Sequence, residues 1–240
     1  MTIRPAATFT TLRSALTLTP REQERCNNVH HLHALVLSGF PLPAPTGAAP
    51  TPRRENVLYA AHRGDPLTDR QHRLLAAPPE RVLVQAPVQP DWQPLINDGR
   101  LTRADVFPVE HHLRAGEFIA IRVIANPVLR NLETGKRLSL TAPHDAADWM
   151  HRHLTRIGLD TAPGDITTSQ RVRITGSRRG RPLTVICRDT AARGRVRDPE
   201  LLVRALTTGI GPAKAYGCGL LRMRIHLTEQ NEEDKIAVLV

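Results

Sequence analysis

The sequence predicts two small α+β domains in tandem, and three observations support this fold class. The length of 240 residues allows one large or two small domains. A hydrophobic content of 40% is enough for a packed core. In both halves, the apolar alternation typical of strands and the apolar stripes typical of helices follow one another. This order is compatible with a βαββαβ, ferredoxin-like plan, which the second half fits better.

The first domain is expected over residues 1–95. Residues 8–18 mix threonine with regularly placed apolar residues and predict an opening strand. We expect Pro20 to end this strand and residues 21–26 to form a polar connection. The other elements expected in this half are a loop at 42–54, strands at 56–62 and 81–86, and a candidate second helix at 67–77.

Residues 29–38 predict a helix that Asn27 or Asn28 caps. Its valines and leucines recur at helical spacing and form one apolar stripe. His33 lies at the edge of that stripe. His30 lies one turn away on the same side, because residues three apart are neighbours on a helix surface.

The second half begins after an expected linker at residues 96–114. The C-terminal domain is expected at 115–228, followed by an acidic tail at 229–240. Asp198 precedes a proline, which is a typical helix start. The other elements expected here are strands at 117–125, 136–141, 166–175, 182–188 and 221–227 and a helix at 145–157, with Asp145 as its N-cap.

Charge and cysteine usage narrow the classes of function. The formal charge of +10 and the pI of about 10.8 favour polyanions, chiefly nucleic acid. No apolar run approaches the 18 residues typical of a membrane span, and no secretory signal is evident. Cys26, Cys187 and Cys218 are far apart, so we expect reduced thiols in a cytoplasmic protein. No cofactor is predicted.

The most distinctive stretch is a glycine-rich segment at residues 209–221. Gly209, Gly211, Gly217 and Gly219 surround Lys214. Glycines permit unusual backbone geometry and close approach, so successive N–H groups could hold phosphate oxygens. The alternative is a tight turn between a helix and a strand. Lys214 is followed by alanine and the segment continues into a strand, so it differs from a P-loop and predicts no ATP binding.

This segment resembles the C-terminal glycine-rich signature of the CasE family, the RNA-processing endoribonucleases of type I-E CRISPR systems. Its order of glycines, lysine, an aromatic residue and Gly-Cys-Gly-Leu-Leu is far more specific than a lone Gly-x-Gly. The resemblance extends over nearly the full length. It includes residues 33–41, in which a histidine precedes Phe-Pro by seven residues, and residues 84–87, 90–92, 125–127 and 135–137.

The resemblance implies two tandem ferredoxin-like (RRM-like) domains with antiparallel sheets, which bind a repeat hairpin in precursor CRISPR RNA. It implies metal-free cleavage, in which the ribose 2′-hydroxyl attacks and leaves a 2′,3′-cyclic phosphate. The spacing to Phe-Pro places the family's catalytic histidine on His33. Similar proteins keep the cut RNA and join other subunits in the surveillance complex called Cascade.

One departure from the family pattern concerns His30. Many members have tyrosine three residues before the catalytic histidine. His30 could replace that tyrosine as a proton carrier or phosphate contact, or it could be a bystander. A metal site at His30, His31 and His33 is disfavoured, because only two of these side chains share a side and no nearby Cys or carboxylate completes a ligand set.

A basic hairpin tip is predicted between the strands at 166–175 and 182–188. Arg178, Arg179 and Arg181 lie there among glycines. A solvated strand face is the alternative, but in so basic a protein nucleic-acid contact is favoured. Arg130, Lys136 and Arg137 are secondary candidates for RNA contact. Lys214 or a nearby arginine could stabilise charge at the reacting phosphate.

Two functions follow from these residues. The first is a metal-independent endoribonuclease that binds a hairpin and cleaves it with His33, with histidine acting as general acid or base near neutral pH. The second is a non-catalytic subunit that holds processed RNA, with the unusual His30 reflecting lost activity. A basic scaffold protein without specific RNA binding is a third possibility.

Overall fold

The fold was analysed in a computed structural model that describes residues 6–40, 56–63, 67–69, 73–178 and 180–225. The first half forms one antiparallel sheet in the order β2-β5-β1-β6. Its elements are β1 (Ala6–Leu18), α1 (Pro20–Cys26), α2 (Val29–Ser38), β2 (Leu58–Arg63), β5 (Pro79–Ala86), α3 (Gln93–Asn97) and β6 (Leu101–Arg114).

The second half repeats this plan around β7 and β13, the central strands of the other sheet. β14 borders β7, and β10, β11 and β12 pair with successive parts of β13. The elements are β7 (Phe118–Ala125), β8 (Val128–Arg130), β9 (Arg137–Ser139), α4 (Pro143–Arg156), β10 (Leu159–Asp160), β11 (Ile166–Thr168), β12 (Val172–Arg178), β13 (Arg181–Val196), α5 (Pro199–Thr208) and β14 (Arg222–Ile225), with short 3₁₀ turns η2 (Pro163–Asp165) and η3 (Lys214–Tyr216).

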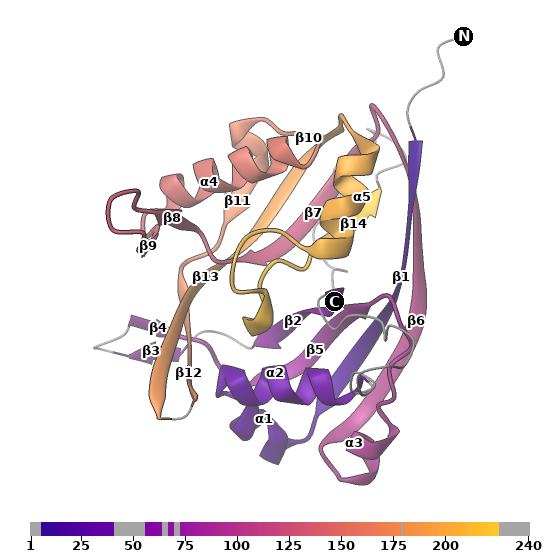
Figure 1. The fold of residues 1–240 in the computed structure, drawn as a ribbon, viewed down its shortest axis with the longest axis vertical. Helices are drawn as coiled ribbons and strands as arrows, with labels where there is room; N and C mark the ends of the chain where they lie inside the picture. Colours follow the sequence, from indigo (N-terminus) through magenta and orange to yellow (C-terminus); the bar gives the residue numbers. More distant parts are fainter. Residues whose placement is uncertain (1–5, 41–55, 64–66, 70–72, 179, 226–240) are drawn as a thin grey trace, which may run out of the picture.

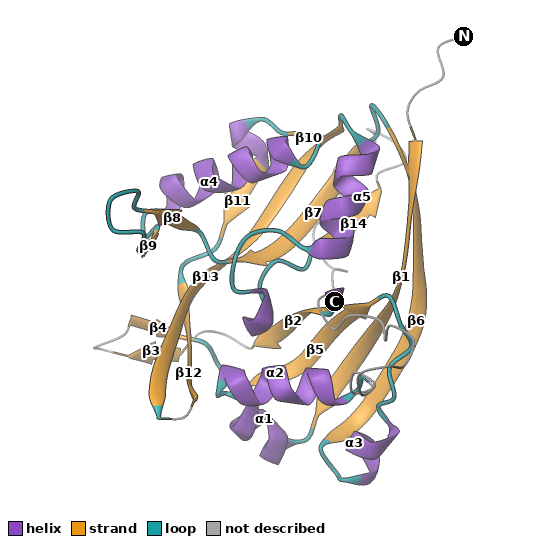
Figure 2. Ribbon diagram, viewed as in Figure 1, coloured by secondary structure: helices purple, strands orange, loops and turns teal. Residues whose placement is uncertain are grey.

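Each half therefore has the strand order of a ferredoxin-like fold, and the predicted tandem α+β architecture with antiparallel sheets is confirmed. Figures 1 and 2 show the helices of both halves on one side of the molecule, in front of the two sheets. One apolar core lies between α1, α2 and the first sheet, and a second lies between α4, α5 and the second sheet.

The two halves share structure at their boundary. Phe9 of β1 and Leu113 of β6 are buried in the core of the second half. Arg13, which is 8% exposed, donates hydrogen bonds to Gln85 Oε1 and to the carbonyl of Leu221. Gln85 in turn donates to the carbonyl of Leu206, at 2.7 Å. The long β1–β6 ribbon thus joins the two sheets.

Residues 96–114 differ from the linker predicted for them. They form the end of α3 and then β6, which pairs with β1 along its length. The first half therefore extends to Arg114. The helix that follows α1 and α2 in this half is the five-residue α3. The candidate helix at 67–77 is instead the hairpin of β3 (Leu67–Asp69) and β4 (Arg73–Leu75), which pairs with β12.

Two further segments at helix starts differ from expectation. Residues 21–26 are helical, because Pro20 occupies the first turn of α1, where its missing N–H costs nothing. α4 begins at Pro143, with Ala142 rather than Asp145 at the N-cap. The N-caps Asn28 and Asp198 are confirmed by side-chain hydrogen bonds to backbone N–H groups. The predicted loop at 42–54 and acidic tail at 229–240 lie outside the described residues.

No helix in the described part of the chain is long and apolar enough to cross a membrane. Cys26, Cys187 and Cys218 are buried free thiols, and Cys187 and Cys218, although far apart in sequence, belong to one apolar cluster.

Candidate functional site

The site is built on α2, whose N-terminus is joined to the predicted basic hairpin. Asn28 Oδ1 accepts hydrogen bonds from the backbone N–H groups of His30 (3.0 Å) and Ser177 (3.3 Å). Asn28 Nδ2 also lies 3.5 Å from the Ser177 carbonyl oxygen. A Cβ at Gly176 would lie 2.5 Å from Asn28 Oδ1, so only glycine lets β12 approach so closely. The helix cap therefore also positions β12.

Both candidate catalytic histidines contact tyrosine rings. The ring of His33 stacks on that of Tyr59 from β2, with centroids 6.4 Å apart. The ring of His30 meets the edge of Tyr216 from η3, with centroids 5.3 Å apart and planes at 90°. These are the only two tyrosines in the chain. Tyr216 is the aromatic residue of the glycine-rich segment, whereas no pattern in the sequence pointed to Tyr59. His30 and His33 are partly exposed on α2, whereas His31 is exposed with Nδ1 3.1 Å from the Arg25 carbonyl oxygen.

The glycine-rich segment packs against these rings. The Tyr59 hydroxyl donates to the carbonyl of Ala215 at 2.7 Å. All four predicted loop glycines have positive φ, and so does Ala213. A Cβ at Gly217 would lie 3.1 Å from the Tyr59 ring. Backbone carbonyls already accept hydrogen bonds from the N–H groups of six residues of this segment: Gly209, Ile210, Tyr216, Gly217, Cys218 and Gly219.

Those internal hydrogen bonds argue against a phosphate-binding role for the glycines. Most of the glycine N–H groups already donate to backbone carbonyls, and the segment forms a tightly packed turn that brings η3 against α2. The turn predicted as the alternative thus accounts for the glycines. What the segment presents next to the histidines is the ring of Tyr216.

Lys214 lies at the start of η3 and is partly buried. Its ammonium donates to the carbonyl of Thr208, 2.8 Å away, at the C-terminus of α5. Cations there interact favourably with the helix dipole. Burial lowers the pKa of Lys214 below its ordinary value. The ammonium group carries three donors, so this one contact leaves donors for a bound phosphate.

The predicted RNA-contacting arginines fall into two groups. Arg178 and Arg181 face each other across the ends of β12 and β13, and Arg181 is exposed. Arg179 and the side chain of Arg178 lie outside what the structure describes. Arg130, Lys136 and Arg137 are exposed on the β8–β9 hairpin beside α4, away from α2 (Figure 1).

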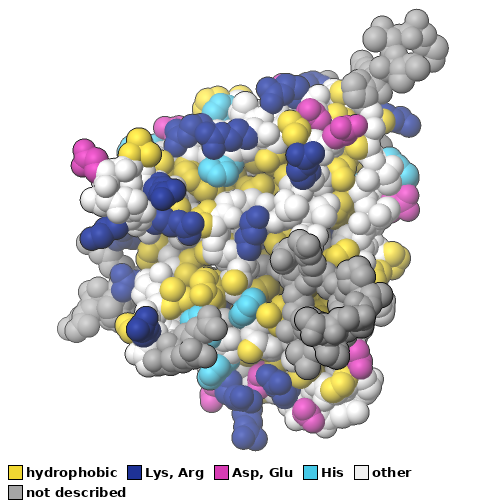
Figure 3. All heavy atoms as spheres, viewed as in Figure 1, with side chains coloured by type: hydrophobic (Ala, Val, Ile, Leu, Met, Phe, Trp, Pro, Cys, Tyr) yellow, Lys and Arg dark blue, Asp and Glu magenta, His cyan; other side chains and the backbone are white. Residues whose placement is uncertain are grey.

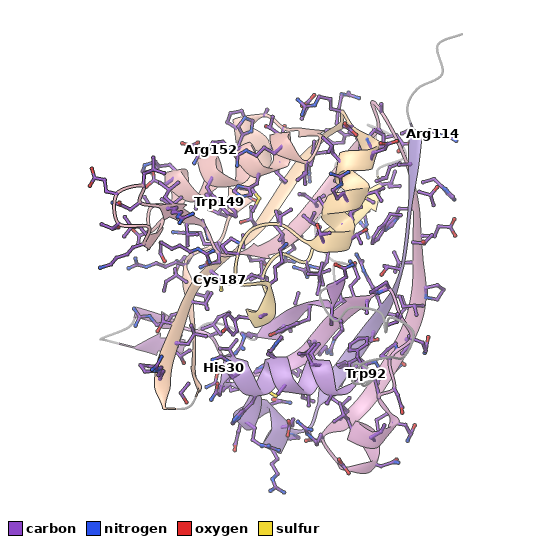
Figure 4. All side chains as sticks on the ribbon, viewed as in Figure 1. His30, Trp92, Arg114, Trp149, Arg152 and Cys187 are labelled. Atoms are coloured by element: carbon purple, nitrogen blue, oxygen red, sulfur yellow. The ribbon has the colours of Figure 1, made fainter. Side chains whose placement is uncertain are left out.

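The helix-covered face is rich in positive charge. Figure 3 shows Lys and Arg side chains gathered over α4 and the β8–β9 hairpin. In Figure 4, His30 and Arg152 both lie on this side of the sheets. Among the described residues, no group of three or more His, Cys, Asp or Glu side chains is placed to hold a metal ion.

Comparison with known proteins assigns the family. The sequence profile described as "CRISPR associated protein" matches residues 12–224. The chain belongs to this CRISPR-associated protein family. A curated member, the CRISPR-associated endoribonuclease Cse3 of Thermus thermophilus, is 33% identical over 156 residues, which are 60% of this chain and 72% of that protein.

Solved structures of family members have the same fold. Thermus thermophilus Cse3, bound to an RNA representing a pre-cleavage complex, matches with a TM-score of 0.68 and 27% identity, over 90% of this chain and 99% of that one. Cas6e of Escherichia coli K-12 matches with a TM-score of 0.58 over 88% and 98% of the two chains, at 18% identity. The predicted membership of the CasE group of CRISPR-associated proteins is confirmed.

Proposed function

We propose that this CRISPR-associated protein is a metal-independent endoribonuclease that binds repeat hairpins of precursor CRISPR RNA, cleaves them and keeps the product. The observation that carries the proposal is the pair of histidines on one side of α2, each packed against a tyrosine from another element. The relationship to Cse3, named an endoribonuclease and solved with RNA, supports the choice of substrate and reaction.

The proposed reaction needs two proton transfers. The ribose 2′-oxygen loses its proton, attacks the phosphorus and forms the P–O2′ bond. The P–O5′ bond breaks and the 5′-oxygen gains a proton, which leaves a 2′,3′-cyclic phosphate and a 5′-hydroxyl. Histidine can perform either transfer near neutral pH. We assign one of these transfers to His33 and propose His30 as the partner group. Lys214 is proposed to stabilise the phosphate charge in the transition state.

Hairpin binding is proposed to use Arg178, Arg179 and Arg181 at the β12–β13 tip. The hydrogen bonds of Asn28 to Ser177 support this role, because they fix the base of that tip relative to α2. An A-form stem has a deep, narrow major groove, which a thin hairpin tip suits better than a flat surface does. Arg130, Lys136 and Arg137 are proposed as secondary contacts.

We further propose that the protein works in the cytoplasm with other Cascade subunits. Three buried free thiols support a reducing compartment. Retention of the cleaved hairpin would make the enzyme nearly single-turnover and leave it attached to the RNA on which the complex assembles.

The test is cleavage of a labelled repeat hairpin in EDTA by the wild type, His33→Ala and His31→Ala. We expect the wild type and His31→Ala to release a product with a cyclic phosphate, and His33→Ala to bind the hairpin without cutting it. His31 is the matched control because it lies on the same helix with an exposed ring. Normal cutting by His33→Ala would refute its role. Binding without cutting by all three proteins would favour the non-catalytic subunit.

A further inference from the structure

Two of the polar groups around the histidines of α2 are engaged within the protein. The hydroxyl of Tyr59 donates to the carbonyl of Ala215, and the ammonium of Lys214 donates to the carbonyl of Thr208. The hydroxyl of Tyr216 differs from both. In the described part of the chain it makes no hydrogen bond, and its oxygen is not shielded from solvent, although the residue is half-buried.

His30 presents a second unoccupied polar group beside this hydroxyl. The rings of His30 and Tyr216 meet at right angles, with their centroids 5.3 Å apart. Among the described residues, none forms a hydrogen bond or an ion pair with the imidazole nitrogens of His30, and neither nitrogen is buried without a partner. A phenol donor and an imidazole therefore lie next to each other, and both are free to bind a ligand.

The backbone of the glycine-rich turn fixes the position of Tyr216. Ala213, with φ 61°, and Gly217, with φ 82°, flank η3 in left-handed conformations, and the N–H of Tyr216 donates to the Ala213 carbonyl at 2.8 Å. The hydrogen bond from Tyr59 holds Ala215, the residue just before Tyr216. A left-handed conformation in a non-glycine residue persists only where the surrounding structure holds it, and such residues cluster at functional sites. The hydroxyl is thus presented from a rigid turn.

The packing of the Tyr216 ring favours its hydroxyl as the group that contacts RNA. Stacking on a base is the other contact typical of tyrosine. The ring already packs against the apolar cluster that includes Val29, Cys187 and Cys218, and against His30. The hydroxyl is the part of the side chain that these contacts leave for a ligand.

We propose that Tyr216 contacts the substrate, and that its hydroxyl donates a hydrogen bond to a non-bridging oxygen of the scissile phosphate. This rests on the proposed function, in which RNA is held at His30 and His33 for proton transfer. The scissile phosphate then lies at the imidazole of His30, within reach of the adjoining phenol. Charge on the non-bridging oxygens grows as the 2′-oxygen attacks, so a donor placed there stabilises the transition state more than the bound substrate.

The first test is Tyr216→Phe, which keeps the packed ring and removes the hydroxyl. Single-turnover cleavage of the repeat hairpin should slow by about 10- to 100-fold, the range for one hydrogen bond to a charged group. Affinity should fall by less than about threefold for a hairpin made uncleavable by a 2′-deoxyribose at the attacking nucleotide, because the contact strengthens in the transition state. The urea midpoint of unfolding should stay unchanged.

An atom-specific test replaces each non-bridging oxygen of the scissile phosphate in turn with sulfur, a weaker hydrogen-bond acceptor. One of the two phosphorothioate hairpins should be cut more slowly by the wild type, and most of that slowing should be absent in Tyr216→Phe, which has no hydroxyl to lose the contact. A purely structural role of Tyr216 would not produce this coupling. Equal slowing of the two proteins with both phosphorothioates would overturn the proposal.

Tyr216→Leu removes the ring as well and serves as the comparison. It should cut more slowly than Tyr216→Phe and lower the urea midpoint, because the packing against His30 and the apolar cluster is lost. If Tyr216→Phe cuts as fast as an active wild type, Tyr216 acts through its ring alone and the proposed hydrogen bond is wrong. A wild type that binds the hairpin without cutting it would refute the proposed function, and with it the contact to a scissile phosphate.

Discussion

The two tyrosines pack against the histidines of α2. Tyr59 is 1% exposed, and its hydroxyl bonds to Ala215, so its ring is a rigid surface for His33. Burial raises the pKa of Tyr59 far above its ordinary range, so the hydroxyl stays protonated as a donor. Tyr216 packs against His30 from the other end of the same turn. The glycine segment therefore acts on the site through its packing.

At the residue level, Gly217→Ala tests this packing. The position has φ +82°, where a non-glycine residue costs about 1–2 kcal/mol. The added Cβ would also lie 3.1 Å from the Tyr59 ring and push it against His33. We expect a larger loss of stability in urea unfolding than the backbone cost alone, together with slower single-turnover cleavage.

Gly99→Ala is the matched control, because Gly99 also has positive φ and its Cβ would meet no atom within 4 Å. It should show only the backbone cost and normal cleavage. Equal losses of stability in the two variants, with cleavage unchanged, would contradict the role assigned to the Tyr59 contact.

At the level of elements, Asn28 joins α2, which carries the proposed catalytic histidines, to the basic hairpin. Asn28→Ala removes the N-cap of α2, which costs about 1 kcal/mol of stability. It also removes the contacts with Ser177. We expect weaker binding of the repeat hairpin, because the β12–β13 tip loses its fixed position relative to α2. The measurement is hairpin affinity alongside urea unfolding.

Asp198→Ala provides the comparison. Asp198 caps α5 with two hydrogen bonds of 3.1 Å, but it lies away from the basic hairpin. This variant should lose similar stability and bind the hairpin as the wild type does. If both variants bind equally well, the Asn28 contacts do not position the hairpin.

Elements with strong local signals could be predicted from the sequence, and those that depend on distant partners could not. α2 and α5 carry caps and apolar stripes, and their starts were predicted correctly. β6 has exposed residues on both faces through most of its length and an internal Pro108, so it lacks the alternation of a half-buried strand. Only its pairing with β1 makes it a strand.

The same contrast applies to the site. His33 and the glycine turn could be singled out because each lies in a short segment that resembles the family, and His30 because it lies one helical turn from His33. Tyr59 lies outside those segments. Tyr216 belongs to the glycine turn, but the contacts of both tyrosines with the histidines arise only through the fold.

For the whole molecule, the two halves are built as one cooperative unit. Phe9 and Leu113 belong to the first sheet but are buried in the second core, and Gln85 links Arg13 to the end of α5. Separating the halves would expose these apolar side chains and leave buried polar groups unpaired, at about 1–3 kcal/mol for each polar group. Partial unfolding of one half is therefore unfavourable.

The chain has two tryptophans, which makes this cooperativity measurable. Trp92 is buried in the first core and Trp149 in the second. Trp149→Phe leaves a fluorescent reporter of the first half, and Trp92→Phe leaves one of the second. In each variant we expect the urea transition seen by fluorescence to coincide with that seen by far-ultraviolet circular dichroism, as two-state unfolding requires. A fluorescence midpoint clearly below the circular dichroism midpoint in either variant would show that one half unfolds first, and that the β1–β6 ribbon does not couple them.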